Sequence, residues 1–447
     1  MTMKTDLTAS TRSTNAAHLT WRHWLYFVLL AAILLADGMD VTIVSHTFPS
    51  LIKEWGVEIG GGIALVVTVG YLAMGLGAIV GGRLADRYGR KKVVVVAALI
   101  MSIGTALGAT AADFGQFTAW RVFASIGIGA VMPLAITLLA DLVPAHRRGA
   151  MVAAGYAAVG LGTTVGAALA AALIPTQGWR GLMIAGGVVP LAIILVLAIV
   201  VPESPSFYAA RGNVERARGL LAKLDPTASL EAFARPDAGE RATRREALAA
   251  ILAPERRWTT LLLWVFGFFS LGTQLLIAQY LPTLLQQPVP GLDTVQSSTI
   301  VGWYGFASVL GAIVLGVILG RVSRFWVIGV NLVLAAVMLI VVALVPNPGF
   351  ETLLPLLAVF AFIVPTAVGP TRNVLAVSAY PTEIRGTGVG ATELSARLGS
   401  ATGGALGGTL IGAGLGLSGV MLVLLVPIAV LLASLVGIGA AARRGTR

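Results

Sequence analysis

The chain has 447 residues, of which 57% are hydrophobic and only 11% are charged, and its formal net charge at pH 7 is +11. A mean hydropathy of +0.89 excludes a water-soluble enzyme or binding domain of this size and indicates a polytopic helical membrane protein. There is no cysteine, and the four histidines are scattered. A disulfide framework and a thiolate metal site are therefore excluded, and we expect no bound metal.

Apolar segments long enough to cross a bilayer as helices occur twelve times along the chain. They lie near 24–45, 62–82, 93–112, 114–140, 150–174, 180–201, 259–285, 297–320, 325–345, 351–378, 386–412 and 416–441. We therefore predict an all-α polytopic membrane protein with twelve transmembrane helices in two six-helix bundles, at 24–201 and 259–441. The tails at 1–23 and 442–447 are polar, and the first of them shows no signal peptide.

Basic residues concentrate in alternate loops. Most of the 31 Lys and Arg lie in the two tails, in 202–258 and in the loops after the even-numbered spans, whereas the opposite loops hold only Lys53 and Arg180. The positive-inside rule then places both termini and 202–258 in the cytoplasm. The basic charge sets the topology and does not indicate a nucleic-acid partner. We expect a monomer in the lipid bilayer of the inner (plasma) membrane.

The stretch 202–258 separates the two groups of spans and begins with Pro-Glu-Ser-Pro. Residues 213–257 have the apolar spacing of short amphipathic helices that lie at a membrane surface. About 55 residues with few large apolar groups cannot bury the core of a separate catalytic domain. The sequence therefore predicts a cytoplasmic linker here.

Two carboxylates, Asp37 and Asp40, lie in the otherwise apolar first span. At about 1.5 Å per residue, Asp40 lies roughly 24 Å along that helix, near the middle of the bilayer. A carboxylate there costs on the order of 2.5–3.5 kcal/mol, so it must face a partner or a wet cavity. We predict a protonatable site on a central pathway. A structural ion pair, or an aspartate that reaches the membrane interface, is the alternative.

The loop 81–92, GGRLADRYGRKK, carries the most specific motif of the chain, G-x-x-x-D-R-x-G-R-K. It resembles the loop between helices 2 and 3 of the major facilitator superfamily. The resemblance implies a gating latch that forms in one conformation and breaks in the other, made by Gly82, Asp86, Arg87, Gly89 and Arg90. The Asp86 carboxylate suits a bond to a facing helix N-terminus or an arginine. A merely basic cytosolic loop is the alternative.

The fourth span contains Arg121, which needs a negative partner inside a membrane. Sugar-porter-like members of the superfamily place an arginine of helix 4 against an aspartate of helix 1, and Arg121 and Asp40 match that pattern. An Arg121 side chain that extends to the membrane interface is the alternative. Asp141 ends the span, where it belongs either to the gate or to a local salt bridge with Arg147 and Arg148.

The second half of the chain repeats the first. Three residues of the loop after span four recur after span ten, where Pro144, Arg148 and Gly149 correspond to Pro381, Arg385 and Gly386. We therefore expect Arg148 and Arg385 to serve the gate in both halves. The position of Asp86 holds Arg324 in the second half, so the latch is degenerate there. Two six-helix repeats around a central cavity are what the resemblance implies.

The eleventh span carries Glu393 and Arg397, whose spacing of four puts them on one helix face. They either neutralise each other, or Arg397 offers its guanidinium group to a substrate carboxylate while Glu393 tunes it or titrates. Arg372 follows Gly369-Pro370 in a broken helix, where it either binds an anion or acts as a gate charge. Other polar groups that we expect in the cavity are Gln274, Gln279 and Tyr304.

The Asp-Gly-Met-Asp of 37–40, the loop 81–92, Arg121 and the Pro-Glu-Ser-Pro segment together resemble the aromatic acid:proton symporter family. The resemblance implies proton-driven import of a small organic anion, benzoate-like or a related carboxylate, by alternating access. The proton is then the coupling ion, and no other cofactor is expected. Arg324 and Glu393 depart from the family pattern and leave the substrate open.

Four other functions remain as alternatives. A sugar or other metabolite symporter and a drug:proton antiporter have the same fold. However, the tail lacks the P-E-T-x-G end of sugar porters, and the fifth span lacks the proline of the antiporter bend. An enzyme would need a nucleophile–base pair or metal ligands, and we can assemble none. A transport-dead sensor usually gains a long soluble extension, which this sequence does not show.

Overall fold

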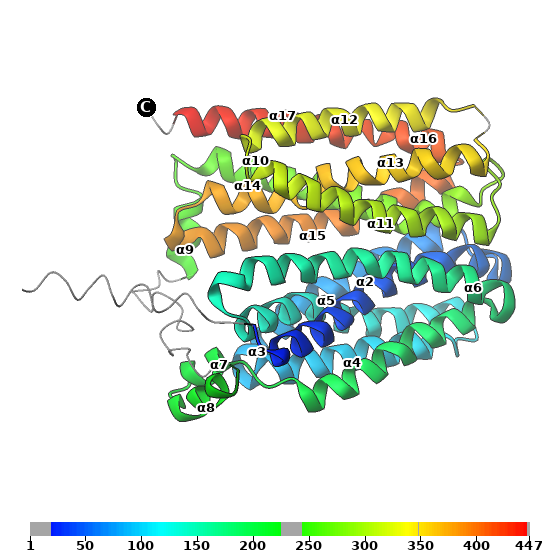
Figure 1. Ribbon diagram of the computed structural model, residues 1–447. Coiled ribbons are helices and arrows are strands. Elements are labelled where there is room, and N and C mark those ends of the chain that lie inside the picture. The colour runs from blue at the N-terminus through cyan, green and yellow to red at the C-terminus, as the bar shows by residue number, and fades with distance from the viewer. Residues whose placement is uncertain (1–18, 225–243, 347, 445–447) are drawn as a thin grey trace, which may run out of the picture.

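The computed structural model describes residues 19–224, 244–346 and 348–444, and these residues form two helical bundles that lie side by side (Figure 1). The predicted tails at 1–23 and 442–447 and the middle of the predicted linker lie wholly or largely outside the described residues. Helices α7, α8 and α9 lie at one end of the molecule, at the left of Figure 1. We call this the linker end and the other the opposite end.

The first bundle contains the blue-to-green helices of Figure 1. Its elements are α2 (Trp21–Trp55), η2 (Ile59–Ile63), α3 (Ala64–Tyr88), α4 (Arg90–Gly108), α5 (Phe114–Leu142) and α6 (Ala145–Val200). These helices are apolar on every face, as expected where lipid replaces water as the surrounding solvent. Large apolar side chains such as Ile199, which is 84% exposed, accordingly lie on the outer surface.

The second bundle holds the remaining long helices. Its elements are α10 (Arg257–Leu285), α11 (Thr294–Leu319), α12 (Arg324–Leu344), α13 (Phe350–Val368), α14 (Thr371–Ala379), α15 (Thr382–Gly412), α16 (Leu417–Val423) and α17 (Leu425–Arg444). The linker contributes α7 (Pro205–Ala210), α8 (Val214–Leu224) and α9 (Arg244–Ile251). The short helices predicted for 213–257 are thus present in its described part, and their place at a membrane surface stays a prediction.

Ten of the described helical segments are long and apolar enough to cross a membrane. One of them, α6, runs through two predicted spans, and the backbone at Gly178 breaks it with φ of 70°. A positive φ is open to glycine at little cost, so the chain reverses there without a longer loop. A further helix, α15, is as long as a span but carries Glu393 and Arg397. Dividing α6 at Gly178 and including α15 gives the twelve predicted spans.

Close helix crossings hold the first bundle together. A Cβ atom at Gly77 of α3 would lie 2.0 Å from the Ile126 carbonyl oxygen of α5, and one at Gly129 of α5 would lie 1.9 Å from the Met74 carbonyl oxygen. Only glycine lets the two backbones approach this closely, and such contacts replace the hydrophobic effect as the source of packing inside a membrane. This pair of crossings fixes α3 against α5.

The two bundles meet along α2, α3 and α6 on one side and α10, α11 and α15 on the other. Their polar and aromatic contacts are Tyr71 Oη to Gln279 Oε1 at 3.0 Å, Thr164 Oγ1 to the Gly302 carbonyl at 3.0 Å, and the Phe48 and Tyr280 rings with centroids 6.4 Å apart. All of these lie in the halves of the helices toward the opposite end. These contacts hold the seam between the bundles together toward the opposite end.

Candidate functional site

The first candidate site is a buried ion pair inside the first bundle. Asp40 of α2 is 1% exposed, and its Oδ2 accepts a hydrogen bond from Arg121 Nη1 of α5 at 2.5 Å. Its other oxygen, Oδ1, accepts from Thr105 Oγ1 of α4 at 2.5 Å. Charge-assisted bonds of this kind are shorter and stronger than neutral ones. The contact that the sequence predicted between Arg121 and Asp40 is therefore present, whereas its role in proton coupling stays a prediction.

Asp37 lies one helical turn before Asp40 and is 6% exposed. Its Oδ1 is enclosed and accepts no hydrogen bond, and no ion pair includes Asp37 among the described residues. The Asp40 carboxylate and the guanidinium groups of Arg121 and Arg397 lie within electrostatic range of it. Since Arg397 belongs to the second bundle, this proximity places Asp37 at the seam between the bundles.

A small cavity adjoins this ion pair on the side of the opposite end. Arg121, Tyr71 and Gln279 line it together with apolar side chains of α2 and α3. The cavity has a volume of about 20 Å³, which is enough for one water molecule. Tyr71 of α3 and Gln279 of α10 line the cavity from the two bundles and are joined by a hydrogen bond across the seam. Gln279, predicted to bind substrate, thus joins the bundles here.

The second candidate site is a group of three charged side chains in the second bundle. The Glu393 carboxylate of α15 lies 3.2 Å from Arg372 Nε of α14 and 3.6 Å from Arg397 Nε of α15. Tyr156 of α6 is 46% exposed and lies within electrostatic range of all three, so the group faces the first bundle across the seam. One carboxylate shared by two guanidinium groups leaves one positive charge, which suits a carboxylate ligand.

A break in the helix explains the position of Arg372. Helix α13 ends before Gly369, whose ψ of −86° is not helical, and α14 begins after Pro370. Arg372 Nη1 donates to the Gly369 carbonyl at 2.9 Å, so it satisfies an acceptor that the break leaves free. Discontinuous helices commonly form ion and substrate sites in transporters. The two roles open from the sequence, an anion site and a gate charge, both stay predictions.

Two other side chains predicted for the cavity lie inside the second bundle. Gln274 of α10 approaches the helix break, with its Oε1 3.0 Å from the position of a Cβ at Gly369. Tyr304 of α11 is 6% exposed, and its ring tilts against Phe360 with centroids 6.5 Å apart. Neither contact shows a role in binding, so both residues remain predictions.

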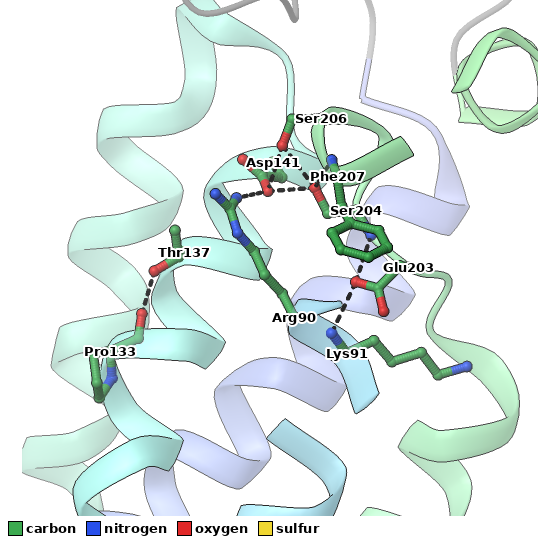
Figure 2. A network of polar contacts seen from close by, with 9 residues as sticks. All are labelled: Arg90, Lys91, Pro133, Thr137, Asp141, Glu203, Ser204, Ser206 and Phe207. Carbon is green, nitrogen blue, oxygen red and sulfur yellow. Dashed lines mark hydrogen bonds and ion pairs between the residues drawn. The ribbon is translucent and has the colours of Figure 1, made fainter. Parts of the chain in front are cut away.

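A polar network ties the linker to the first bundle (Figure 2). Arg90 at the start of α4 forms an ion pair with Asp141 at the end of α5. Two serine hydroxyl groups that follow Pro202-Glu203, those of Ser204 and Ser206, donate to the same Asp141 oxygen. The local salt bridge of Asp141 with Arg147 or Arg148 is therefore wrong as an explanation. Its cationic partner comes from the loop 81–92, which brings the chain ends of α4, α5 and α7 together.

Glu203 provides the second half of the network in Figure 2. Its Oε1 accepts from the Lys91 backbone N–H at 2.9 Å, at the positive N-terminus of α4. A Cβ at Gly89 would lie 2.3 Å from Glu203 Oε2, and the φ of Gly89 is 109°. Glycine is thus needed at this position for two reasons. The conformation of the loop 81–92 depends on Glu203, which the sequence analysis did not single out.

The contacts of the other predicted gate residues do not indicate a gate. Asp86, Arg87 and Gly82 lie on the last turns of α3, and Asp86 is exposed without a hydrogen bond or ion pair to any described residue. Arg385 Nε donates to the Tyr380 carbonyl at 3.3 Å, where it caps the turn before α15. Arg148 lies half-buried at the start of α6. The latch role of these residues stays a prediction.

An Asp141→Asn variant is expected to lower the melting temperature of the detergent-solubilised protein. The change removes the charge that holds Arg90, and a partly buried hydrogen bond to a charged group contributes about 1.5–3 kcal/mol. The matched control is Asp113→Asn at the other end of the same helix. There the side chain caps α5 by accepting from the Gln116 N–H, and asparagine caps as well as aspartate. Equal melting temperatures for the two variants would contradict this account of the network.

Some site residues were not foreseen from the sequence. Thr105, Tyr71 and Tyr156 are single polar residues in long apolar spans, where a hydroxyl group usually bonds its own helix backbone. Glu203 had a signal, because it lies in the Pro-Glu-Ser-Pro segment that the resemblance identified. Among the described residues, no group of three or more His, Cys, Asp or Glu side chains is placed to hold a metal ion.

Two bundles of six helices that meet around buried charged groups, with the seam closed toward one end, define a multi-pass membrane transporter. A sequence profile of the Major Facilitator Superfamily matches residues 30–404. The chain therefore belongs to this superfamily, whose members are transporters and not enzymes. The predictions of the fold and of the superfamily are confirmed.

The comparisons with individual proteins agree. A gallate transporter from Pseudomonas putida is 33% identical over 396 residues, which cover 88% of this chain and 87% of that protein. The 4-hydroxybenzoate transporter PcaK from Pseudomonas putida is 31% identical over 418 residues, 93% of this chain and 92% of that protein. The inward-open structure of the xylose transporter XylE from E. coli matches the fold with a TM-score of 0.70 at 18% identity, over 93% of this chain and 95% of that one.

Proposed function

We propose that the protein imports a small aromatic carboxylate together with protons. The observation that carries this proposal is the pair of charged sites that face each other across the seam. One holds the Asp40–Arg121 pair next to Asp37, and the other holds Glu393 between Arg372 and Arg397. The first offers a protonatable carboxyl group and the second a net positive charge for an anion. The similarity to gallate and 4-hydroxybenzoate transporters supports an aromatic acid as that anion.

The orientation follows from the distribution of basic residues. The linker end carries the basic loops, the start of α2 and the end of α17, so we place it in the cytoplasm of a cell whose inner membrane holds the protein. The seam closed at the opposite end then corresponds to an inward-open conformation. In the outward-open form the Tyr71–Gln279 contact separates, and substrate and proton enter between the same helices.

The driving force depends on how many charges move. A pH difference of one unit supplies about 1.36 kcal/mol for each proton. The membrane potential supplies about 2.3 kcal/mol for each net charge per 100 mV. One proton with one monoanion moves no net charge, so only the pH difference would drive it.

The proposal is tested by uptake of labelled benzoate, 4-hydroxybenzoate and gallate into proteoliposomes with an imposed inward proton gradient. Glucose and a cationic dye serve as outgroup substrates. Accumulation of one of the acids that requires the gradient supports the proposal. Movement of glucose or the dye, with none of the acids accumulated, would refute it in favour of a sugar symporter or a drug antiporter.

An Arg397→Gln variant is expected to raise the KM for the transported acid by about 10- to 100-fold. The change removes one charge-assisted hydrogen bond to the substrate carboxylate, which contributes about 1.5–3 kcal/mol. Arg180→Gln is the matched control, because Arg180 lies at the opposite end, where its 41% exposed side chain pairs with Glu54. An unchanged KM for Arg397→Gln would show that the anion binds elsewhere.

A further inference from the structure

The two aspartates of α2 differ in their surroundings. Both oxygens of Asp40 accept hydrogen bonds, one from Arg121 and one from Thr105, each at 2.5 Å. Asp37 is almost as deeply buried, yet its Oδ1 has no donor, and no arginine lies in contact with it within the described chain. The two carboxyl groups therefore differ in the number of donors that stabilise a negative charge.

This difference decides which group stays ionised. A buried carboxylate is stable when a cation and hydrogen-bond donors replace its lost hydration, as they do for Asp40. Removing the proton from Asp37 instead leaves a buried charge with an oxygen that no donor reaches, which is unfavourable. Asp40 can bind a proton only by releasing Arg121, which would then be a buried cation without its partner. Asp37 can bind or release a proton without breaking a contact.

The charged neighbours of Asp37 come from three helices. Asp40 lies on the same helix as Asp37, and the guanidinium groups of Arg121 of α5 and Arg397 of α15 lie within electrostatic range of Asp37. Helix α10 also packs on α2, but its only charged residue is Arg257 at its first position. Helix α6 meets α2 through Gly162, whose Cβ position lies 2.1 Å from the Leu35 carbonyl, so glycine backbone and not a charge faces α2 there. The charge of Arg397 therefore influences whether Asp37 is ionised, and an anion bound to Arg397 would change that influence.

We propose that Asp37 carries the coupled proton and that Asp40 is the permanent counter-ion of Arg121. This inference rests on the proposed function. It assigns to Asp37 a step that the pairing of Arg121 with Asp40 would otherwise suggest for Asp40. In the outward-open form a proton from water binds to Asp37, and in the inward-open form the same proton returns to water. No other bond forms or breaks.

The charges of the two sites then balance in both forms of the protein. With Asp37 protonated, the three central arginines (Arg121, Arg372 and Arg397) exceed the remaining carboxylates (Asp40 and Glu393) by one positive charge, which a monocarboxylate neutralises. Without substrate, ionised Asp37 neutralises the same charge. The central sites are therefore neutral both in the loaded protein and in the empty protein. Neither form moves a net charge through the bilayer when it changes between the outward-open and inward-open conformations. The structure thus points to electroneutral symport of one proton with each monoanion.

The test compares three variants in proteoliposomes with the labelled acid that the wild type accumulates. Asp37→Asn should lose gradient-driven accumulation. It should keep exchange of internal for external acid, lowered severalfold, with a rate that no longer depends on pH over about one and a half units to either side of neutrality. Asp37→Glu should restore part of the accumulation. Asp40→Asn should lose both accumulation and exchange, because Arg121 loses its partner. Glu351→Gln, an exposed residue at the start of α13, is the matched control.

Two results would overturn the inference. One is exchange that still depends on pH in Asp37→Asn, and the other is exchange that no longer depends on pH in Asp40→Asn. A transport current that accompanies uptake of a monoanion by the wild type would contradict the charge balance. Melting of each purified variant separates loss of folding from loss of coupling. If the wild type accumulates no acid at all, the proposed function itself fails, which is a different result.

Discussion

In a protein that carries Val67→Cys and Gly404→Cys, oxidation is expected to abolish transport almost completely, and reduction is expected to restore it. A Cβ at Gly404 of α15 would lie 2.6 Å from Val67 Cγ1 of α3. The two cysteine Cβ atoms would therefore be about 4 Å apart, within the range of disulfides. The bond would join the two bundles near the opposite end and hold the seam closed there. Alternating access requires this seam to open, so the locked protein cannot complete a cycle.

The sequence contains no cysteine, so no native thiol can form another disulfide or react with a thiol reagent in this experiment. Each single-cysteine protein, treated with the same oxidant, controls for the substitution itself. Mobility on a denaturing gel does not report an intramolecular bond reliably, so loss of both thiols to a maleimide reagent measures the extent of cross-linking. Full cross-linking with undiminished transport would show that the α3–α15 contact is not part of the moving seam.

The number and order of the spans could be predicted because the membrane imposes a strict length and hydropathy on each helix. The merged helix α6 was predicted as two spans, and the structure divides it only at Gly178. The apolar pattern is interrupted there by Thr176, Gln177 and Gly178, so the sequence marks the reversal even though the chain has almost no loop. Helix boundaries are the weaker part of the prediction, because hydropathy marks only the apolar part of a helix: the first span was expected at 24–45, and α2 extends over Trp21–Trp55.

The polar sites were predictable where a rare charge must find a partner. Arg121 and Asp40 were paired correctly, because few residues can neutralise a buried arginine. For Asp141, the alternative to a gate role was a salt bridge with Arg147 or Arg148, and this alternative named the wrong partners, because only the tertiary structure brings Arg90 to Asp141. The hydroxyl group of Thr105 was not foreseen, because threonine is common in apolar helices and its contact spans two helices.

An Arg121→Met variant is expected to lose transport and about 3–5 kcal/mol of stability, because it leaves the Asp40 carboxylate buried without a cation. The double variant Arg121→Met with Asp40→Leu removes both charges and keeps apolar side chains of similar size. It should regain most of the lost stability, since a buried ion pair can be replaced by apolar residues at little cost, but it should not regain transport.

Melting of the purified proteins in detergent and uptake in proteoliposomes measure the two effects separately. Recovery of melting without recovery of uptake would mean that the ion pair serves the transport cycle more than the fold. A double variant as unstable as the single one would assign the loss to the packing of the Arg121 side chain. In the folded protein Arg121 lines the small cavity beside Tyr71 and Gln279, so its charge lies where the seam must open. An apolar pair in place of Arg121 and Asp40 would leave this cavity without a positive charge, even if the pair packs well. The proton on Asp37 and an entering anion both interact with that charge, so we expect transport to be lost.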